Sequence, residues 1–258
     1  MTAPTATTTT ADAAARSRST GTRATRIIGV VTVIMMGWLV AFGLGFSPAD
    51  RDQDEAVRIM YVHVPTVWVA YLALSLAAVC SAVYLFSKNH SLGFDRFAGA
   101  SAEIATVFMA LTLISGMLWG RITWGVYWQW DARLTSFALL LVSTIGYLAV
   151  RGLGGSHHQR AKRSAVVMLL VVLEIPLVHW SVRWWRSLHQ EATVLDTDLD
   201  PDIDGLMLFS LFVGFVAFSL LYAWLVLHRT RALAMQDMLD DEGLDRALAA
   251  RRAEGAPS

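Results

Sequence analysis

The stretch Val64-Pro-Thr-Val-Trp-Val-Ala-Tyr-Leu-Ala-Leu-Ser-Leu-Ala-Ala-Val-Cys-Ser-Ala-Val-Tyr-Leu-Phe86 decides the fold of this chain. It contains no Asp, Glu, Lys or Arg. About 20 consecutive apolar residues suffice for a helix to cross the roughly 30 Å hydrocarbon core of a bilayer. The stretch therefore predicts a transmembrane helix.

Five further windows have the same character and lie at 26–46, 103–119, 134–150, 164–180 and 206–227. Of the 258 residues, 55% are hydrophobic and only 16% are charged, and the mean hydropathy is +0.48. The hydrophobic share is higher and the charged share lower than in typical soluble domains. The sequence predicts an all-α integral membrane protein with a six-helix membrane domain over 26–227. Basic and acidic residues balance at 21 each, so the chain has no net positive charge that would attract nucleic acid.

The distribution of basic residues predicts the orientation of the helices. Fifteen of the 21 Lys and Arg residues fall in the two tails and in the second and fourth loops, and six fall on the other side. Loops that stay in the cytoplasm carry the excess of positive charge. We therefore expect both termini to be cytoplasmic and the first, third and fifth loops to be extracytoplasmic.

The two ends of the chain differ in composition from the membrane domain. Residues 1–25 are rich in Thr, Ala and Ser and predict a disordered cytoplasmic tail, although their Arg content also fits an organelle transit peptide. Residues 228–258 mix leucines with charges and predict an amphipathic helix in a cytoplasmic tail.

Tryptophan is concentrated on the predicted outer side. Seven of the ten tryptophans lie at or between outer helix ends, namely Trp119, Trp124, Trp128, Trp130, Trp180, Trp184 and Trp185. An interfacial aromatic belt is the ordinary explanation, but a belt decorates both membrane faces. One-sided enrichment favours an aromatic platform for a planar ligand. If the segment is helical, Trp124 and Trp128 stack on one face of a short interfacial helix.

Charged and imidazole groups near these tryptophans suit a porphyrin. Arg133 can fork onto a propionate, and Asp131 can organise the loop. Three histidines are predicted on the outer side, and imidazole is a common axial ligand of haem iron. His63 is expected at the end of the first outer loop and His189 in the last one, whereas His179 is expected at the lipid boundary.

Three motifs carry a resemblance to a known family. They read Trp124-Gly125-x-x-Trp128-x-Trp130-Asp131-x-Arg133-Leu134-Thr135, within a Trp-rich segment at 119–136, together with Tyr61-x-His63-Val64-Pro65 and Ser181-Val182-x-Trp184-Trp185-x-x-Leu188-His189-Gln190. The first resembles the tryptophan-rich signature of the haem-handling proteins of cytochrome c biogenesis. The other two resemble the flanking motifs of its maturation-protein-C branch. The resemblance covers roughly residues 26–227.

This resemblance implies a function and a set of site residues. Haem of the b type would be bound transiently at the outer face of a bacterial inner membrane, with His63 and His189 as axial ligands of the iron. The contact residues implied are Trp119, Trp124, Trp128, Trp130, Asp131, Arg133, Trp184 and Trp185. The haem would pass to a periplasmic haem chaperone, and the chain would work beside an ABC-type ATPase, a second membrane subunit and a small single-span subunit.

Two other functions compete with haem delivery, which is not an enzymatic role. The first is a b-type cytochrome subunit that moves electrons, and it would need haem ligands in both leaflets. The second is a haem-transporting permease, and it would need a polar path through the spans. The chain has no phosphate-binding GxxxxGK[ST] loop, so any use of ATP belongs to another subunit.

Overall fold

The chain is helical in a computed structural model that describes residues 19–189, 203 and 205–254. Within these residues six helical stretches are long and apolar enough to cross a membrane. They cover Arg23–Phe46, Glu55–Phe86, Leu92–Trp124, Ala132–Arg151, His157–Trp184 and Gly205–Arg246. The prediction of an all-α integral membrane protein with six spans is confirmed. Most of the predicted N-terminal tail, residues 1–18, lies outside the described residues.

Over the described part of the chain, the spans are built from nine helical elements. In chain order these are α2 (Arg23–Leu39), the π-helical η1 (Val40–Phe46), the 3-10 helix η2 (Glu55–Ile59), α3 (Met60–Phe86), α4 (Leu92–Trp124), α5 (Ala132–Arg151), α6 (His157–Val171), α7 (Glu174–Trp184) and α8 (Gly205–Glu254). The fifth span divides into α6 and α7 because Pro176 cannot donate a backbone hydrogen bond to Val172. The carbonyl of Val172 accepts instead from the amide of Ile175, at 3.1 Å.

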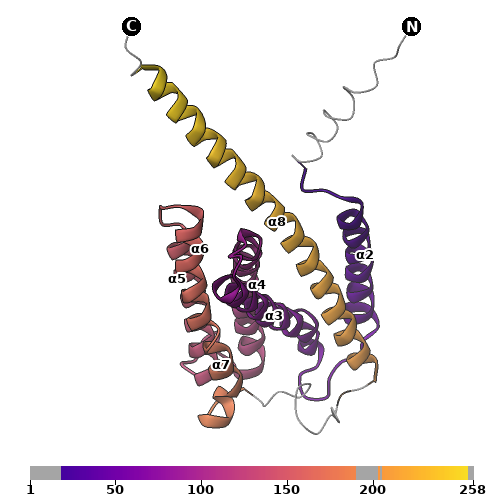
Figure 1. Cartoon of the computed structure of the whole chain (residues 1–258). Coiled ribbons are helices and arrows are strands. Elements are labelled where there is room, and N and C mark those ends of the chain that lie inside the picture. The colour runs from indigo at the N-terminus through magenta and orange to yellow at the C-terminus, as the bar shows by residue number, and fades with distance from the viewer. Residues whose placement is uncertain (1–18, 190–202, 204, 255–258) are drawn as a thin grey trace, which may run out of the picture.

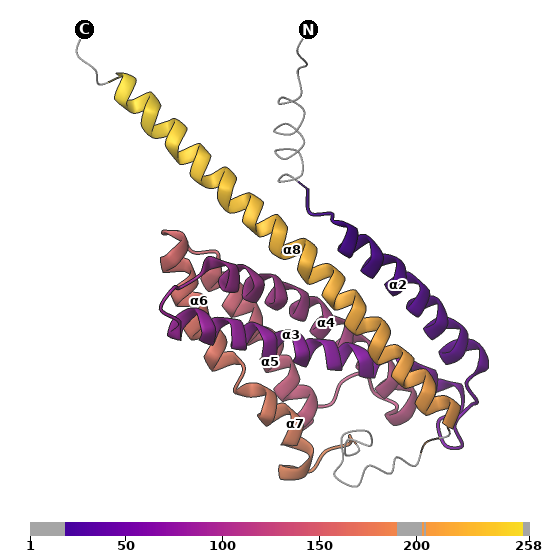
Figure 2. The same cartoon turned by 45° about the vertical axis from the view of Figure 1, so that its right-hand side comes forward.

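The antiparallel pair α3 and α4 forms the centre of the bundle (Figure 1). Helices α5, α6 and α7 lie on one side of this pair, and α8 crosses its other side. Helix α2 lies against α8, away from α5 to α7 (Figure 2). This arrangement leaves most of α2 exposed, as a helix in contact with lipid would be.

Small side chains allow the two central helices to approach closely. Between lipid-embedded helices, small residues permit tight backbone packing where the hydrophobic effect supplies no driving force. The fully buried alanines recur at intervals of three or four on both helices, at Ala70, Ala73 and Ala77 of α3 and at Ala98, Ala102 and Ala105 of α4.

The two ends of the bundle have different connections. The segments 47–59, 125–131 and 185–189 lie at one end, which we call the histidine end. The start of α2, the projecting end of α8 and the loops 87–91 and 152–156 lie at the opposite end, which we call the tail end (Figure 1). The charge distribution predicts the same two sets of segments for the two membrane faces. The compartment that each face meets is still a prediction.

Buried ion pairs tie the helices together at the tail end. The guanidinium of Arg151 on α5 donates to both carboxylate oxygens of Asp95 on α4, at 2.5 and 2.8 Å. Asp237 on α8 accepts from Arg96 at 2.7 Å and from Arg160 at 3.1 Å. The contacts of Asp237 lie beyond the predicted end of the last span, and α8 continues as one helix as far as Glu254, so the segment predicted as an amphipathic tail helix is the end of α8.

Candidate functional site

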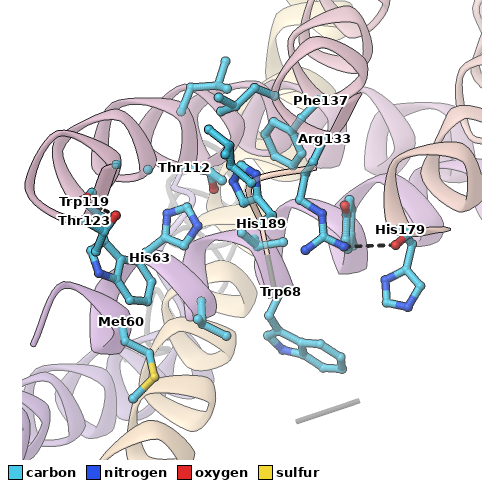
Figure 3. Close-up of a pocket in the computed structure, with 18 of the residues that line it drawn as sticks. Met60, His63, Trp68, Thr112, Trp119, Thr123, Arg133, Phe137, His179 and His189 are labelled. Carbon is cyan, nitrogen blue, oxygen red and sulfur yellow. Dashed lines mark hydrogen bonds between the residues drawn. The ribbon is translucent and has the colours of Figure 1, made fainter. Parts of the chain in front are cut away.

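A pocket of about 340 Å³ opens at the histidine end between α3, α4, α5, α7, α8 and the segment that follows α7 (Figure 3). Among the tryptophans, histidines and charged residues singled out above, six line it, namely His63, Trp119, Trp124, Arg133, His179 and His189. These side chains come from distant parts of the sequence. The pocket therefore exists only in the folded bundle.

His63 enters the pocket from α3. The expectation that it ends a loop is wrong, because α3 begins at Met60 and His63 is the fourth residue of the helix. Its ring packs against Gly116 of α4, where an added Cβ would lie 2.9 Å from Cε1 of His63. The Nδ1 of His63 lies 3.0 Å from Oγ of Ser115, whose hydroxyl donates to the carbonyl of Leu111 at 2.8 Å. The hydroxyl oxygen is thus free to accept from Nδ1.

His189 enters the pocket from the segment after α7. Its Nδ1 donates to the Asp131 carboxylate at 2.9 Å, and the amide of Leu188 donates to the other carboxylate oxygen at 3.1 Å. The ring of Trp124 stands edge-on to the imidazole with centroids 4.7 Å apart. The contacts with Asp131 and Trp124 fix the position of this imidazole, and the Leu188 amide ties the same segment to Asp131.

The ionisation of this pair follows from its surroundings. Burial lowers the pKa of His189, and the attraction of Asp131 offsets only part of that effect. Burial alone would raise the pKa of Asp131, but hydrogen bonds from Ser187 and Leu188 and the proximity of His189 lower it overall. At neutral pH the pair is therefore a neutral imidazole beside an ionised carboxylate.

The two imidazoles are suited to holding a metal between them. Both use Nδ1 for hydrogen bonds within the protein, which leaves Nε2 of each ring for another ligand. His63 and His189 face the same space from different elements (Figure 3). Neutral imidazole nitrogens of this kind fit the axial positions of haem iron.

Arg133 places a cation in the same pocket. It lies in the first turn of α5, and its Nη2 donates to the carbonyl of His179 at 3.1 Å (Figure 3). Within the described ranges, no carboxylate lies within ion-pair distance of its guanidinium. The remaining donors of Arg133 can therefore bind an acidic group of a ligand.

The predicted tryptophan platform divides into two groups. Trp119 and Trp124 line the pocket, and Nε1 of Trp119 donates to Oε1 of Gln53 at 2.7 Å. The other five tryptophans of the predicted platform are not among the lining residues, namely Trp128, Trp130, Trp180, Trp184 and Trp185. Trp128 and Trp130 pack edge to face against each other, with Trp130 83% exposed, and Trp184 and Trp185 are also exposed.

The helical interpretation of the segment between Trp124 and Trp128 is wrong. Helix α4 ends at Trp124, because Gly125 adopts the left-handed conformation with φ at 78°. The next helix begins after Asp131, whose side chain caps it by accepting from the amide of Arg133 at 3.2 Å. The two tryptophans consequently do not share a helical face.

The pocket reaches further into the membrane domain than the sequence predicts. It continues along α3 from Met60 to Tyr71, a rise of about 16 Å. Trp68 and Tyr71 of α3 line this inner part with Phe137 of α5 and Phe215 of α8. Tyr71 lies two turns beyond His63 on the same face of α3, and that spacing is the sequence feature that could have revealed it.

Comparison with known proteins places the chain in a family. The sequence model of the family described as Heme exporter protein C matches residues 7–243. The chain belongs to the Heme exporter protein C family. It is 35% identical to Heme exporter protein C of Haemophilus influenzae over 208 residues, which cover 80% of this chain and 82% of that protein.

Other members of the family are similarly related. Heme exporter protein C of Escherichia coli K12 is 35% identical over 211 residues, covering 81% of this chain and 82% of the relative. The putative cytochrome c biosynthesis ccmC-like mitochondrial protein of Arabidopsis thaliana is 30% identical over 209 residues, which cover 79% of this chain and 78% of that protein. The resemblance drawn from the three motifs is thus confirmed.

Proposed function

We propose that this membrane protein binds haem in the pocket at the histidine end and delivers it to a periplasmic haem chaperone for cytochrome c maturation. One observation carries the proposal: His63 and His189 come from α3 and from the segment after α7, and both face one pocket. The relatives are named for heme export and cytochrome c biosynthesis, which supports haem as the ligand.

Each group in the pocket has a role in this proposal. His63 and His189 coordinate the iron through Nε2 from two elements. Trp119 and Trp124 contact the macrocycle, and Arg133 binds a propionate. Trp128, Trp130, Trp184 and Trp185, which do not line the pocket, cover the edge of the haem that leaves it.

The cellular setting is part of the same proposal. The chain resides in a bacterial inner membrane with both termini in the cytoplasm, so the histidine end faces the periplasm. It works with an ABC-type ATPase, a second membrane subunit and a small single-span subunit. It holds b-type haem transiently as cargo and is a delivery component rather than an enzyme, and it does not bind nucleic acid.

The histidines at the tail end favour delivery over electron transfer. A b-type cytochrome that moves electrons across the membrane needs ligands near both faces. At the tail end, His157 uses both ring nitrogens on Asp237 and Asp241, the rings of His90 and His158 both pack against Tyr84, and His228 contacts Thr20. They lie in the loop after α3 and on α6 and α8, and none of these four histidines lines the pocket at the histidine end.

The inward limit of the pocket argues against a permease. The lining residues extend from the histidine end only as far as Tyr71 and Phe215. Beyond them, at the tail end, Asp95 of α4 and Arg151 of α5 form a buried ion pair.

Absorption spectroscopy of the detergent-purified protein tests the proposal. We expect a low-spin haem spectrum that is lost in His63→Gly and His189→Gly and partly restored by added imidazole. His179→Gly is the matched control, because His179 also lines the pocket but is not a proposed ligand. A low-spin spectrum unaltered in either ligand variant, or lost only in the control, would contradict the assignment.

A further inference from the structure

The two candidate iron ligands differ in the group that accepts their Nδ1 hydrogen. His189 donates to the carboxylate of Asp131 at 2.9 Å. His63 faces the hydroxyl of Ser115 at 3.0 Å. One ligand is therefore supported by an anion and the other by a neutral group.

We propose that Asp131 is a positioning residue that holds His189 as its Nδ1–H tautomer and makes His189 the stronger of two unequal iron ligands. His63, whose Nδ1 faces the neutral hydroxyl of Ser115, is the weaker ligand and is displaced first when the haem leaves. This inference rests on the proposed haem-binding function and adds to it the order in which the two bonds between histidine and iron break.

The tautomer follows from the chemistry of the carboxylate. An ionised carboxylate only accepts hydrogen bonds, so the hydrogen of this contact must reside on Nδ1 of His189. The lone pair of the neutral ring is then on Nε2, the nitrogen that remains for iron. In the free imidazole side chain the other tautomer is preferred, with the hydrogen on Nε2. Without Asp131, the ring would thus present the wrong nitrogen most of the time.

The carboxylate is itself held rigidly. It is 6% exposed and caps α5 by accepting from the amide of Arg133. Its other oxygen accepts from the amide of Leu188, next to the ligand. Asp131 therefore joins the start of α5 to the segment that carries His189, and a change in either element would move the imidazole.

The difference between the acceptors sets the difference in ligand strength. A carboxylate behind a metal-bound imidazole raises the basicity of the coordinating nitrogen. Ser115 offers only a lone pair of a neutral hydroxyl, because its hydrogen is donated to the carbonyl of Leu111. Hydrogen bonds to charged acceptors are roughly twice as strong as neutral ones. The iron is thus expected to stay on His189 when the bond to His63 breaks.

Nitrogen-15 NMR of histidine-labelled apoprotein tests the tautomer without haem. We expect the His189 resonances, assigned by their loss in His189→Gln, to show the Nδ1–H form in the wild type. In Asp131→Ala they should shift towards the Nε2–H form. An Nε2–H tautomer in the wild type, or no shift in Asp131→Ala, would overturn the inference.

The reduction potential of the haem-loaded protein tests the inequality. Asp131→Asn keeps a carbonyl acceptor and the helix cap but removes the charge, so we expect retained low-spin haem with a raised potential. Ser115→Ala removes the neutral acceptor of His63 and should shift the potential less. Equal shifts, or an unchanged potential in Asp131→Asn, would overturn the unequal-ligand inference while leaving haem binding intact.

The two measurements also separate this inference from the proposed function. A wild-type apoprotein with the expected tautomer that takes up no haem would refute haem binding and with it the order of release. A haem-binding wild type with the wrong tautomer would refute only the role of Asp131.

Discussion

Gly116 of α4 makes room for the imidazole of His63 on α3. A Cβ at position 116 would lie 2.9 Å from Cε1 of His63, closer than real side chains approach. The glycine therefore determines how deeply the histidine sits between the two helices. Its contribution to the site is steric, because glycine has no side chain to offer a ligand.

Substitution of Gly116 should displace His63 and weaken iron coordination. We expect Gly116→Val to lose low-spin haem while the protein still inserts into the membrane, since overpacking costs about 1–3 kcal/mol and the ring is the movable neighbour. The absorption spectrum of the purified variant measures this. Gly146→Val on α5 is the control, because nothing lies within 4 Å of a Cβ there. A normal low-spin spectrum in Gly116→Val would show that iron coordination does not depend on the position of His63 beside Gly116.

Haem ligation should persist into mildly acidic solution and fail as the pH falls further. Burial lowers the pKa of His189 below its ordinary value of 6.5, so the neutral, coordinating form survives at pH 6.5. Protonation removes the lone pair that binds iron, and the low-spin spectrum is therefore lost below that pH. A spectroscopic titration measures the midpoint. Loss of the spectrum at or above pH 6.5 would contradict the prediction.

The tryptophans that line the pocket should matter more than the exposed ones. Stacking of an aromatic side chain on a planar ligand contributes about 1–3 kcal/mol, so we expect Trp124→Ala to weaken haem binding roughly five- to a hundredfold. Trp130→Ala is the matched control, because Trp130 is 83% exposed and does not line the pocket. Haem titration of both variants measures the difference. Equal losses would place the macrocycle on the exposed tryptophans instead.

Arg133 should recognise a carboxylate of the ligand. A hydrogen bond to a charged group contributes about 1.5–3 kcal/mol, so Arg133→Gln should bind haem roughly ten- to a hundredfold more weakly. The dimethyl ester of haem lacks the acidic groups. It should bind the wild type and the variant with similar affinity. If the ester distinguishes the two proteins as strongly as haem does, Arg133 acts on something other than a propionate.

The sequence predicts the six spans because hydrocarbon imposes a minimum apolar length that a local window can count. It underestimates α4, which starts at Leu92 rather than near residue 103. Asp95 makes the start of this helix look polar, yet its side chain is 3% exposed and paired with Arg151. A hydropathy window counts the charge of Asp95 but does not detect its partner Arg151, which lies 56 residues away in the sequence.

The candidate site was predictable to a similar extent. Motif spacing identifies His63, His189 and Arg133, whose side chains all reach the pocket. The motif around Trp124 also contains Trp128 and Trp130, which do not line the pocket. Phe215 could not be predicted as a lining residue, because its place depends on how α8 crosses α3.

Removal of one partner from the buried pair at the tail end should destabilise the bundle. The side chains of Asp95 and Arg151 are 3% and 9% exposed, so Arg151→Gln leaves a buried carboxylate without its bidentate partner. Breaking such a pair costs about 3–5 kcal/mol. We expect a clearly lower midpoint of thermal unfolding for the detergent-purified variant. Arg246→Gln is the control, because the pair of Arg246 with Glu242 is largely exposed and its loss should leave the midpoint unchanged. Equal midpoints for both variants would mean that the Asp95–Arg151 pair does not hold α4 and α5 together.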